Sequence, residues 1–440
     1  MTGSGPGTRP AARLLARLAL LAALGSLVVL LLALGDGGLL VVGAGFLGLV
    51  LCAAGIWWFV AHRGAVRLIG LLLAIAAPIG VVVLFAYGGL WLTALILCLC
   101  WGVALACARQ ALRRSRPKRS MRAVAAEPPK NPVLIMNPKS GGGKVGRFHL
   151  VERAEELGAR VILLDPSAPA DVAELARGAV TEGADLLGVA GGDGTQALVA
   201  AVAAEHDLPF LVISAGTRNH FAMDLGLDRS DPSRCLDALT DGEELRIDLG
   251  DVDGRAFVNT VSFGVYADVV QHPEYRDAKA GTALTLMPDL LLGDGVRRLD
   301  ARIDDTMLSA QQALLISNNP YVSPDELTGG GRRPTLDDGE LGVLGIRVED
   351  AAQAADLAVR GSQSTALTVR TAHRVEVTAH TAEIPVAVDG EALRMPTPVT
   401  CTLRPGALRV RVPRNRPGVP APVPPVRWRR IFDLAFGRRI

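Results

Sequence analysis

Four long apolar stretches near the N-terminus restrict what this chain can fold into more than any other feature. They cover residues 18–35, 39–61, 68–87 and 90–108, and none of them contains Asp, Glu, Lys or Arg. Each has about the length, roughly 20 residues, that a helix needs to cross a bilayer. Because three more stretches follow the first, we expect a membrane span there rather than a signal peptide. The sequence therefore predicts four transmembrane helices within residues 1–110.

The basic residues between these stretches predict how the spans are oriented. They lie in three segments: Arg9, Arg13 and Arg17, then Arg63 and Arg67, then residues 109–122, where seven arginines and lysines stand without an acid. Basic segments stay on the cytoplasmic side. We therefore expect a multi-pass protein of the inner (plasma) membrane, with both termini and the remainder of the chain in the cytoplasm. These segments also suit anionic lipid head groups.

The pattern changes after a basic linker at 111–130. Short apolar runs then alternate with stretches of helical periodicity. The expected strands are 132–136, 160–164, 185–190 and 209–213, and the expected helices are about 147–158, 169–182 and 196–205. Strands that alternate with helices in this way indicate a parallel sheet. We predict an α/β domain over 131–245, completed by residues near 400–412.

The pattern changes again near residue 246. Short and often alternating runs, separated by Gly, Asp or Asn, indicate a mainly antiparallel β-rich domain over 246–399, with a helical insert near 279–295. Residues 413–440 begin as a Pro-rich linker and end in a basic tail. Apolar residues of this tail fall on one helical face, which is typical of a helix in the membrane interface.

A glycine-rich turn follows the expected strand at 185–190. It reads Gly191-Gly192-Asp193-Gly194-Thr195. Glycine lacks a Cβ, so backbone N–H groups in such a turn can approach phosphate oxygens. The helix that follows directs its N-terminus at the same anion. Asp193 can hold a magnesium ion or a water bound to it, so the turn predicts a nucleotide triphosphate site.

Two other loops follow parallel strands, at the sheet edge where ligands of such sheets gather. Residues 137–144 read Asn-Pro-Lys-Ser-Gly-Gly-Gly-Lys, which offers backbone amides and two lysines but lacks Walker A spacing. Thr217 and Asn219 add short polar side chains after the next strand. The predicted nucleotide contacts are Asn137, Lys139, Ser140, Gly141, Gly191, Gly192, Gly194, Thr195, Thr217 and Asn219.

Two acidic turns come late in the chain, at Asp337-Asp338-Gly339 and Asp389-Gly390-Glu391. Each by itself is consistent with an ordinary β-turn. Phosphoryl transfer to an alcohol, however, needs metal-held phosphates and a carboxylate that takes the hydroxyl proton. In a chain with a phosphate turn, an Asp pair suits magnesium and a Glu suits the base.

The order of these motifs resembles the diacylglycerol kinase catalytic domain family, which includes bacterial lipid kinases and sphingosine kinases. The resemblance covers about 130–412 and rests on the loop at 137–141, the turn at 191–195, residues 216–222, Phe257-Val258-Asn259, Asp337-Asp338-Gly339 and Asp389-Gly390-Glu391. Two departures lie beside or within these motifs. Ala197 and Leu198 replace a frequent Asn-Glu, and His220 replaces the Asp of a frequent Asn-Asp-Phe, which leaves contact with a ligand or filling of the turn as roles for His220.

The resemblance implies a fold and a set of roles. The fold would be an NAD kinase-like nucleotide domain followed by a β-sandwich lipid domain, with ATP in the cleft between them. Asp193 and the surrounding glycines would meet the ATP phosphates. Asp337 and Asp338 would support a magnesium ion, and Glu391 would activate the lipid hydroxyl.

We therefore predict a membrane-anchored, ATP-dependent lipid kinase whose acceptor is most simply diacylglycerol, which would give phosphatidic acid. Another lipid alcohol, such as a sphingoid base, a polyprenol or a glycolipid, would need only a reshaped groove. The alternative from a different class is a non-catalytic membrane protein that binds nucleotide or lipid. The presence of Asp193, Asp338 and Glu391 argues against it.

Other classes fit the sequence less well. Spans without ionisable residues favour an anchor over a transport path, and a soluble substrate such as NAD gives no reason for four spans. The six cysteines include no Cys-x-x-Cys pair, so neither a zinc site nor a disulfide framework is supported. We expect no nucleic-acid partner, and a homo-oligomer formed through the spans stays open.

Overall fold

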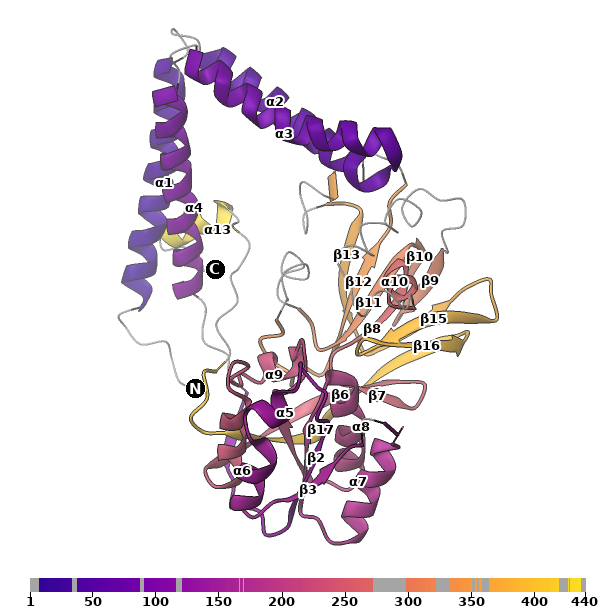
Figure 1. The fold of residues 1–440 in the computed structure, drawn as a ribbon. Coiled ribbons are helices and arrows are strands. Elements are labelled where there is room, and N and C mark those ends of the chain that lie inside the picture. The colour runs from indigo at the N-terminus through magenta and orange to yellow at the C-terminus, as the bar shows by residue number, and fades with distance from the viewer. Residues whose placement is uncertain are drawn as a thin grey trace.

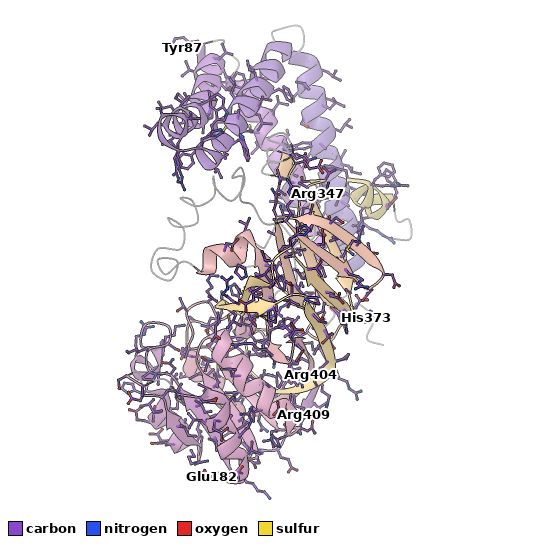
Figure 2. All side chains as sticks on the ribbon, turned by 90° about the vertical axis from the view of Figure 1, so that its right-hand side faces the viewer. Tyr87, Glu182, Arg347, His373, Arg404 and Arg409 are labelled. Atoms are coloured by element: carbon purple, nitrogen blue, oxygen red, sulfur yellow. The ribbon has the colours of Figure 1, made fainter. Side chains whose placement is uncertain are left out.

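The chain folds into a set of long helices, an α/β domain and a β-rich domain (Figure 1). The computed structural model describes residues 8–33, 38–87, 91–115, 121–165, 167–168, 170–271, 298–321, 332–349, 353, 356–357, 364–418, 426 and 428–436. The helical insert expected near 279–295 and the prolines of 419–425 lie outside these residues. Tyr87, at the end of the third helix, and Glu182 of the α/β domain lie at opposite ends of the molecule (Figure 2).

Four helices near the N-terminus confirm the predicted apolar helical region. They are α1 (Thr8–Ala33), α2 (Gly38–Ala61), α3 (Gly64–Tyr87) and α4 (Trp91–Ser115), and each is long and apolar enough to cross a membrane. Helix α1 packs along α4, and α2 along α3 (Figure 1). Buried alanines line the α1–α4 seam at helical spacing, at positions 12, 16 and 19 of α1 and 104, 108 and 111 of α4. Small side chains allow such close helix packing within a membrane.

The α/β domain confirms the predicted fold class. Its parallel strands are β2 (Pro132–Met136), β3 (Arg160–Leu163), β4 (Leu186–Ala190) and β5 (Pro209–Ile213), in the order β5-β4-β2-β3. Every residue of β2, β4 and β5 is buried. Strands covered on both faces are expected to read as continuous apolar runs, which explains why the sequence revealed them.

Helices cover both faces of this sheet. Their bounds are α5 (Lys144–Arg147), α6 (Leu150–Glu156), α7 (Val172–Thr181), α8 (Asp193–Glu205), α9 (His220–Asp224) and a 3-10 helix, η2 (Pro232–Leu239). Helices α7 and α8 pack together, and α6 packs with η2 (Figure 1). The helix expected at about 147–158 is present as α6 but begins at Leu150, because His149 has a left-handed φ of 49° and separates α5 from α6. Helix α8 begins at Asp193 rather than at Gln196.

One long strand, β17 (Val399–Pro413), belongs to both domains. Its residues 409–411 pair in parallel with β5, and most of its length pairs antiparallel with β6 (Gly242–Val252). Its first residues also pair with β14 (Arg374–Thr378). Figure 2 labels Arg404 and Arg409 on this strand. The main path of the sheet therefore runs without a break, in the order β10-β9-β14-β17-β5-β4-β2-β3.

A second, antiparallel sheet confirms the β-rich region. Its order is β13-β12-β11-β8-β15-β16, with bounds β8 (Thr260–Gly264), β11 (Ala313–Asn318), β12 (Leu341–Ile346), β13 (Leu367–Ala372), β15 (Glu383–Val388) and β16 (Glu391–Pro396). It shares an apolar core with β7 (Arg255–Phe257), β9 (Leu299–Ile303), β14 and the start of β17. Phe257, Phe263, Val375 and Val386 lie fully buried in that core. Strands β1 (Ala123–Ala125) and β10 (Thr306–Gln311) and helix α10 (Val265–Gln271) complete the two domains.

The C-terminal helix α13 (Trp428–Phe436) returns to the membrane helices (Figure 1). Ile431 and Ala435 are fully buried against α1 and α4. The rings of Trp428 and Trp101 lie 5.5 Å apart, and Arg17 Nε donates to the carbonyl of Ala435 at 3.1 Å. The amphipathic helix is thus present and docks on α1 and α4, while its contact with lipid stays a prediction.

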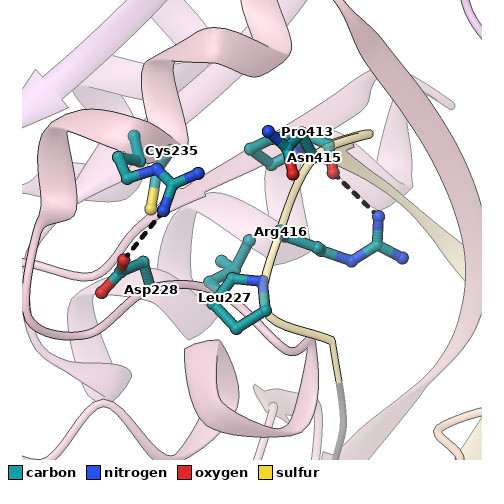
Figure 3. A pocket seen from close by; sticks show the side chains of 8 residues that line it. Leu227, Asp228, Cys235, Pro413, Asn415 and Arg416 are labelled. Carbon is teal, nitrogen blue, oxygen red and sulfur yellow. Dashed lines mark hydrogen bonds and ion pairs between the residues drawn. The ribbon is translucent and has the colours of Figure 1, made fainter.

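Both connections to the membrane helices leave the α/β domain at the start of β6. On the entry side, β1 pairs with residues 243–245. On the exit side, Arg414 N donates to the Asp241 carbonyl at 3.1 Å, and Arg416 pairs with Glu243. Figure 3 shows this corner, where Arg416 also donates to the Pro413 carbonyl at 2.9 Å. Two segments therefore join one edge of the domain to the α1–α4 pair.

The packing of α13 predicts how it responds to a buried charge. We expect Ile431→Asp to detach the helix, because an unpaired carboxylate is costly in an apolar contact. Tryptic cleavage after Arg429 and Arg430, followed by mass spectrometry in native membranes, should accelerate roughly tenfold or more. Phe432→Asp is the matched control, because Phe432 is 45% exposed and should leave the docked helix in place. Equal cleavage rates for wild type and Ile431→Asp would contradict the docking.

Candidate active site

Three loops meet at the carboxyl ends of β2, β4 and β5. Asn137 N donates to the last carbonyl of β4 at 2.9 Å. A Cβ added to Gly141 would strike the carbonyl oxygen of Ala215, and one added to Gly216 would lie 2.9 Å from the carbonyl oxygen of Gly191. The loops approach so closely that only glycine fits at these two positions. The structure therefore brings the three predicted loops together.

The turn at 191–195 forms the first turn of α8. Gly192 precedes the helix with an extended backbone, and no side chain caps it. The first N–H groups of a helix have no partner within the helix, and its positive end favours an anion. The buried amide of Gln196 donates to the Gly191 carbonyl at 3.0 Å and fixes the turn. This helix start can receive a phosphate group.

Asp193 projects from this first turn. Its Oδ2 accepts a hydrogen bond from the His220 backbone N–H at 3.3 Å. Its Oδ1 is buried and has no hydrogen-bond partner among the described residues, and the same holds for Asn219 Oδ1 and Gln196 Oε1. Buried oxygens are normally satisfied, and carboxylate and amide oxygens are suited to a hard cation or its waters. The donor set at this edge of the sheet therefore fits a magnesium ion.

The described residues hold no group of three or more His, Cys, Asp or Glu side chains arranged to bind a metal ion. A magnesium ion often keeps several waters and uses one or two carboxylates together with substrate phosphates. A single well-placed carboxylate such as Asp193 is consistent with that mode. A dedicated all-protein cage is absent from the part of the chain that the structure describes.

His220 lies half-buried beside Asp193. Burial lowers the pKa of its imidazole, and nearby arginines act in the same direction, against the opposite pull of Asp193. The imidazole is therefore mainly neutral at pH 7. Its backbone N–H holds Asp193, so the residue contributes to the turn whatever its side chain contacts.

The polar side chains of the other two loops mostly support the loops themselves. Asn219 has a left-handed φ of 52°, and its Nδ2 donates to the carbonyls of Ser214 and Gly216 at 2.9 and 2.7 Å. Lys144 Nζ donates to the Ser214 carbonyl at 3.3 Å, and burial lowers the pKa of this lysine. The side chains of Lys139 and Thr217 are exposed. Nucleotide contacts by Asn137, Lys139, Ser140, Thr217 and Asn219 stay predictions.

The turn that contains Asp337 and Asp338 is fixed to both domains. Asp338 N donates to Asn319 Oδ1 at 2.8 Å, and Thr335 Oγ1 donates to Asp338 Oδ2 at 2.7 Å. Leu336 is fully buried in the core of the α/β domain, while Asp337 is exposed. One oxygen of Asp338 thus holds the turn itself. Magnesium binding by this Asp pair stays a prediction.

Glu391 lies against the phosphate turn. A Cβ added to Gly194 would be 2.7 Å from the carboxyl carbon of Glu391 and 3.0 Å from its Cγ. A side chain at position 194 would have to displace the Glu391 carboxylate, and glycine leaves that space to it. Two motifs that stand almost two hundred positions apart in the chain form one site. It contains Asp193, the start of α8 and the carboxylate of Glu391.

Asp389 fixes the segment that carries Glu391. Its carboxylate accepts from the backbone N–H groups of Val258 and Asn259 at 2.8 Å and of Thr260 at 3.0 Å. Burial raises the pKa of Asp389 to about 7, although the three amides act in the opposite direction. The sequence placed Asp389 in a turn without a role. The only sequence feature that pointed to a role for Asp389 was the resemblance of residues 257–259 and 389–391 to motifs of one family.

A second buried network was missed by sequence reasoning. Arg333 and Asp224 form an ion pair at 2.7 Å with both side chains buried. Arg333 also donates to the carbonyls of Val258 and Asn318 at 2.7 Å and to Asn259 Oδ1 at 2.6 Å. This arginine joins α9 to the same segment that Asp389 binds. No local pattern in the sequence distinguishes it from other arginines.

Part of this chain is similar to known proteins. Residues 131–252 match the sequence model of the family described as diacylglycerol kinase catalytic domain. The chain is 33% identical to a diacylglycerol kinase of Bacillus subtilis over 136 residues, which is 30% of this chain and 45% of that protein.

Two other comparisons concern proteins with the same description. A diacylglycerol kinase of Mycobacterium tuberculosis is 34% identical over 120 residues, which is 27% of this chain and 39% of that protein. A solved structure of a diacylglycerol kinase from Bacillus anthracis covers 64% of this chain and 96% of its own, with 16% identity and a TM-score of 0.46. The matches to the curated diacylglycerol kinases span less than half the length of each relative.

The raised pKa of Asp389 predicts a pH-dependent contribution to stability. In the folded protein this carboxyl loses its proton near pH 7, against an ordinary value of 3.8. Between these values the unfolded chain binds fewer protons, so stability falls as the pH rises from about 4 to 7. In detergent, the unfolding midpoint of the wild type should therefore fall relative to that of Asp389→Asn as the pH rises through this range. At higher pH the difference between the two midpoints should stay constant. Parallel pH profiles of the two proteins would contradict this interpretation.

Proposed function

We propose that the protein is an ATP-dependent lipid kinase that transfers the γ-phosphoryl group to the hydroxyl of a membrane lipid, most simply diacylglycerol, to give phosphatidic acid. The observation that carries the proposal is the contact between Glu391 and Gly194 beside Asp193. Through this contact the Glu391 carboxylate, which we propose as the base, lies beside a helix start suited to phosphate. The match of residues 131–252 to the diacylglycerol kinase family supports the same reaction class.

Each part of the site has a task in this proposal. The backbone N–H groups at the start of α8 and of the two neighbouring loops bind the ATP phosphates. Asp193 Oδ1 would hold a magnesium ion or one of its waters, and Asp337 and Asp338 would support it. ATP would supply the phosphoryl group, and a bound cation would offset the charge that develops on it. These groups align the phosphate for attack.

Glu391 acts on the lipid side of the reaction. The hydroxyl proton moves to the Glu391 carboxylate while the hydroxyl oxygen forms a bond to the γ-phosphorus. The bond from phosphorus to the bridging oxygen breaks, and ADP leaves.

In this proposal the membrane helices hold the active site close to its lipid acceptor. The four apolar helices cross the inner membrane, with both termini and the kinase domain on the cytoplasmic side, where ATP is available. The basic segments and α13 contact anionic head groups. The two connections from the start of β6 hold the kinase domain near the α1–α4 pair. A lipid substrate would then be reached within the bilayer that anchors the enzyme.

A labelling assay in native membranes tests the proposal. With radiolabelled γ-phosphate ATP, magnesium and total lipid extract, the wild type should produce a labelled lipid that migrates as phosphatidic acid. Glu391→Gln should lower the rate by about 10²–10⁴, the usual effect of removing a general base, and should keep ATP binding.

Glu376→Gln is the matched control, because Glu376 lies on β14 and forms its ion pairs with Arg302 of β9 and Arg374 of β14, outside the proposed site. It should label lipid at the wild-type rate. Near-normal turnover by Glu391→Gln would refute its role as base. Absence of any labelled lipid with the wild type would refute the kinase, and a labelled lipid of other mobility would identify a different lipid alcohol.

A further inference from the structure

Glu391 forms an ion pair with a residue that no motif contains. Arg255 Nη2 lies 2.6 Å from Glu391 Oε2. The two side chains are 33% and 42% exposed, so the pair is reachable by solvent. A partly exposed pair of this kind adds little to stability. Its importance has to come from the position it gives to the carboxylate.

The two oxygens of the Glu391 carboxylate face different neighbours. Oε2 accepts the hydrogen bond from Arg255. Oε1 is the atom nearest to the place where a side chain on Gly194 would begin. The ion pair with Arg255 therefore orients the Glu391 carboxylate, with Oε1 toward the turn at 191–195. Because the guanidinium stays charged and presents its donors in a rigid plane, it restricts rotation of the carboxylate more than a lysine would.

The backbone of Arg255 is itself held firmly. Arg255 pairs with Val252 in the β6–β7 hairpin. Two residues later, Phe257 is fully buried, and a Cβ added to Gly250 would strike its ring. The next three residues donate their N–H groups to Asp389. The hairpin thus holds the Glu391 segment at two points, through Asp389 and through Arg255.

We infer that Arg255 is a positioning residue for Glu391. It holds Oε2 so that Oε1 faces the start of α8, where the proposed reaction needs the base. The inference rests on the proposed function and adds a residue that the family motifs do not include. It predicts that loss of Arg255 slows the chemical step and leaves nucleotide binding intact.

Steady-state kinetics of the full chain in native membranes test this role. Arg255→Gln should lower kcat by about 10–100-fold, because a misplaced catalytic group loses rate steeply, and should change the KM for ATP less than about twofold. Arg255→Lys should recover part of the loss, since it keeps the charge but not the planar fork. Arg302→Gln removes an exposed pair with Glu376 of 2.8 Å and should leave kcat unchanged.

A double-mutant cycle separates positioning from other roles. In the Glu391→Gln background, Arg255→Gln should cause no further loss, because residues that act as a unit are not additive. Additive losses, an increase in the KM for ATP, or an unchanged kcat in Arg255→Gln would each overturn the inference. If Arg255→Gln does not fold, the Arg255→Lys kinetics and the corresponding cycle decide the question. An inactive wild type would instead refute the proposed kinase itself.

Discussion

The arrangement of the α/β domain and the β-rich domain depends on the hydrogen bonds of one strand, β17. Its end pairs in parallel with β5, and its beginning pairs with β6 and β14. A strand shared between two domains fixes their relation through backbone geometry, which does not depend on side chains. Strand β16 and its first residue, Glu391, precede β17 by a few positions. Strand β17 thus relates the two domains, and Asp389 fixes the segment of Glu391 within the β-rich domain.

The site combines groups that local structure alone would leave unsatisfied. Asp193 Oδ1 and Asn219 Oδ1 are buried without partners among the described residues, and Gly194 leaves room that Glu391 occupies. Proteins tend to break local rules of satisfaction and packing at functional sites. In contrast, Asp389 and Arg333 are fully engaged, and both bind the segment at 258–260. The site thus combines buried oxygens that have no partner among the described residues with a hydrogen-bonded network that fixes the segment at 258–260.

The sequence predicted the parts of the fold that leave a local pattern. Strands β2, β4 and β5 are buried on both faces, so each reads as an unbroken apolar run. The break at His149 was missed, because nothing nearby marks a left-handed backbone at that residue. Arg255 and Arg333 were missed because the carboxylates with which they pair lie at least a hundred positions away. Such pairs are set by tertiary structure, and only the motif order hinted that residues 257–259 meet 389–391.

The most direct test of the account asks whether Gly194 and Glu391 lie together in the membrane-bound protein. The Cγ of Glu391 is 3.0 Å from the Cβ position of residue 194, which places two cysteine Cβ atoms near the roughly 3.5–4.5 Å that a disulfide spans. Gly194→Cys combined with Glu391→Cys should form a disulfide under mild oxidation in native membranes, detected by mass spectrometry, whereas neither single variant should form one at this site. Absence of that bond in a folded double variant would contradict the shared site and the function proposed from it.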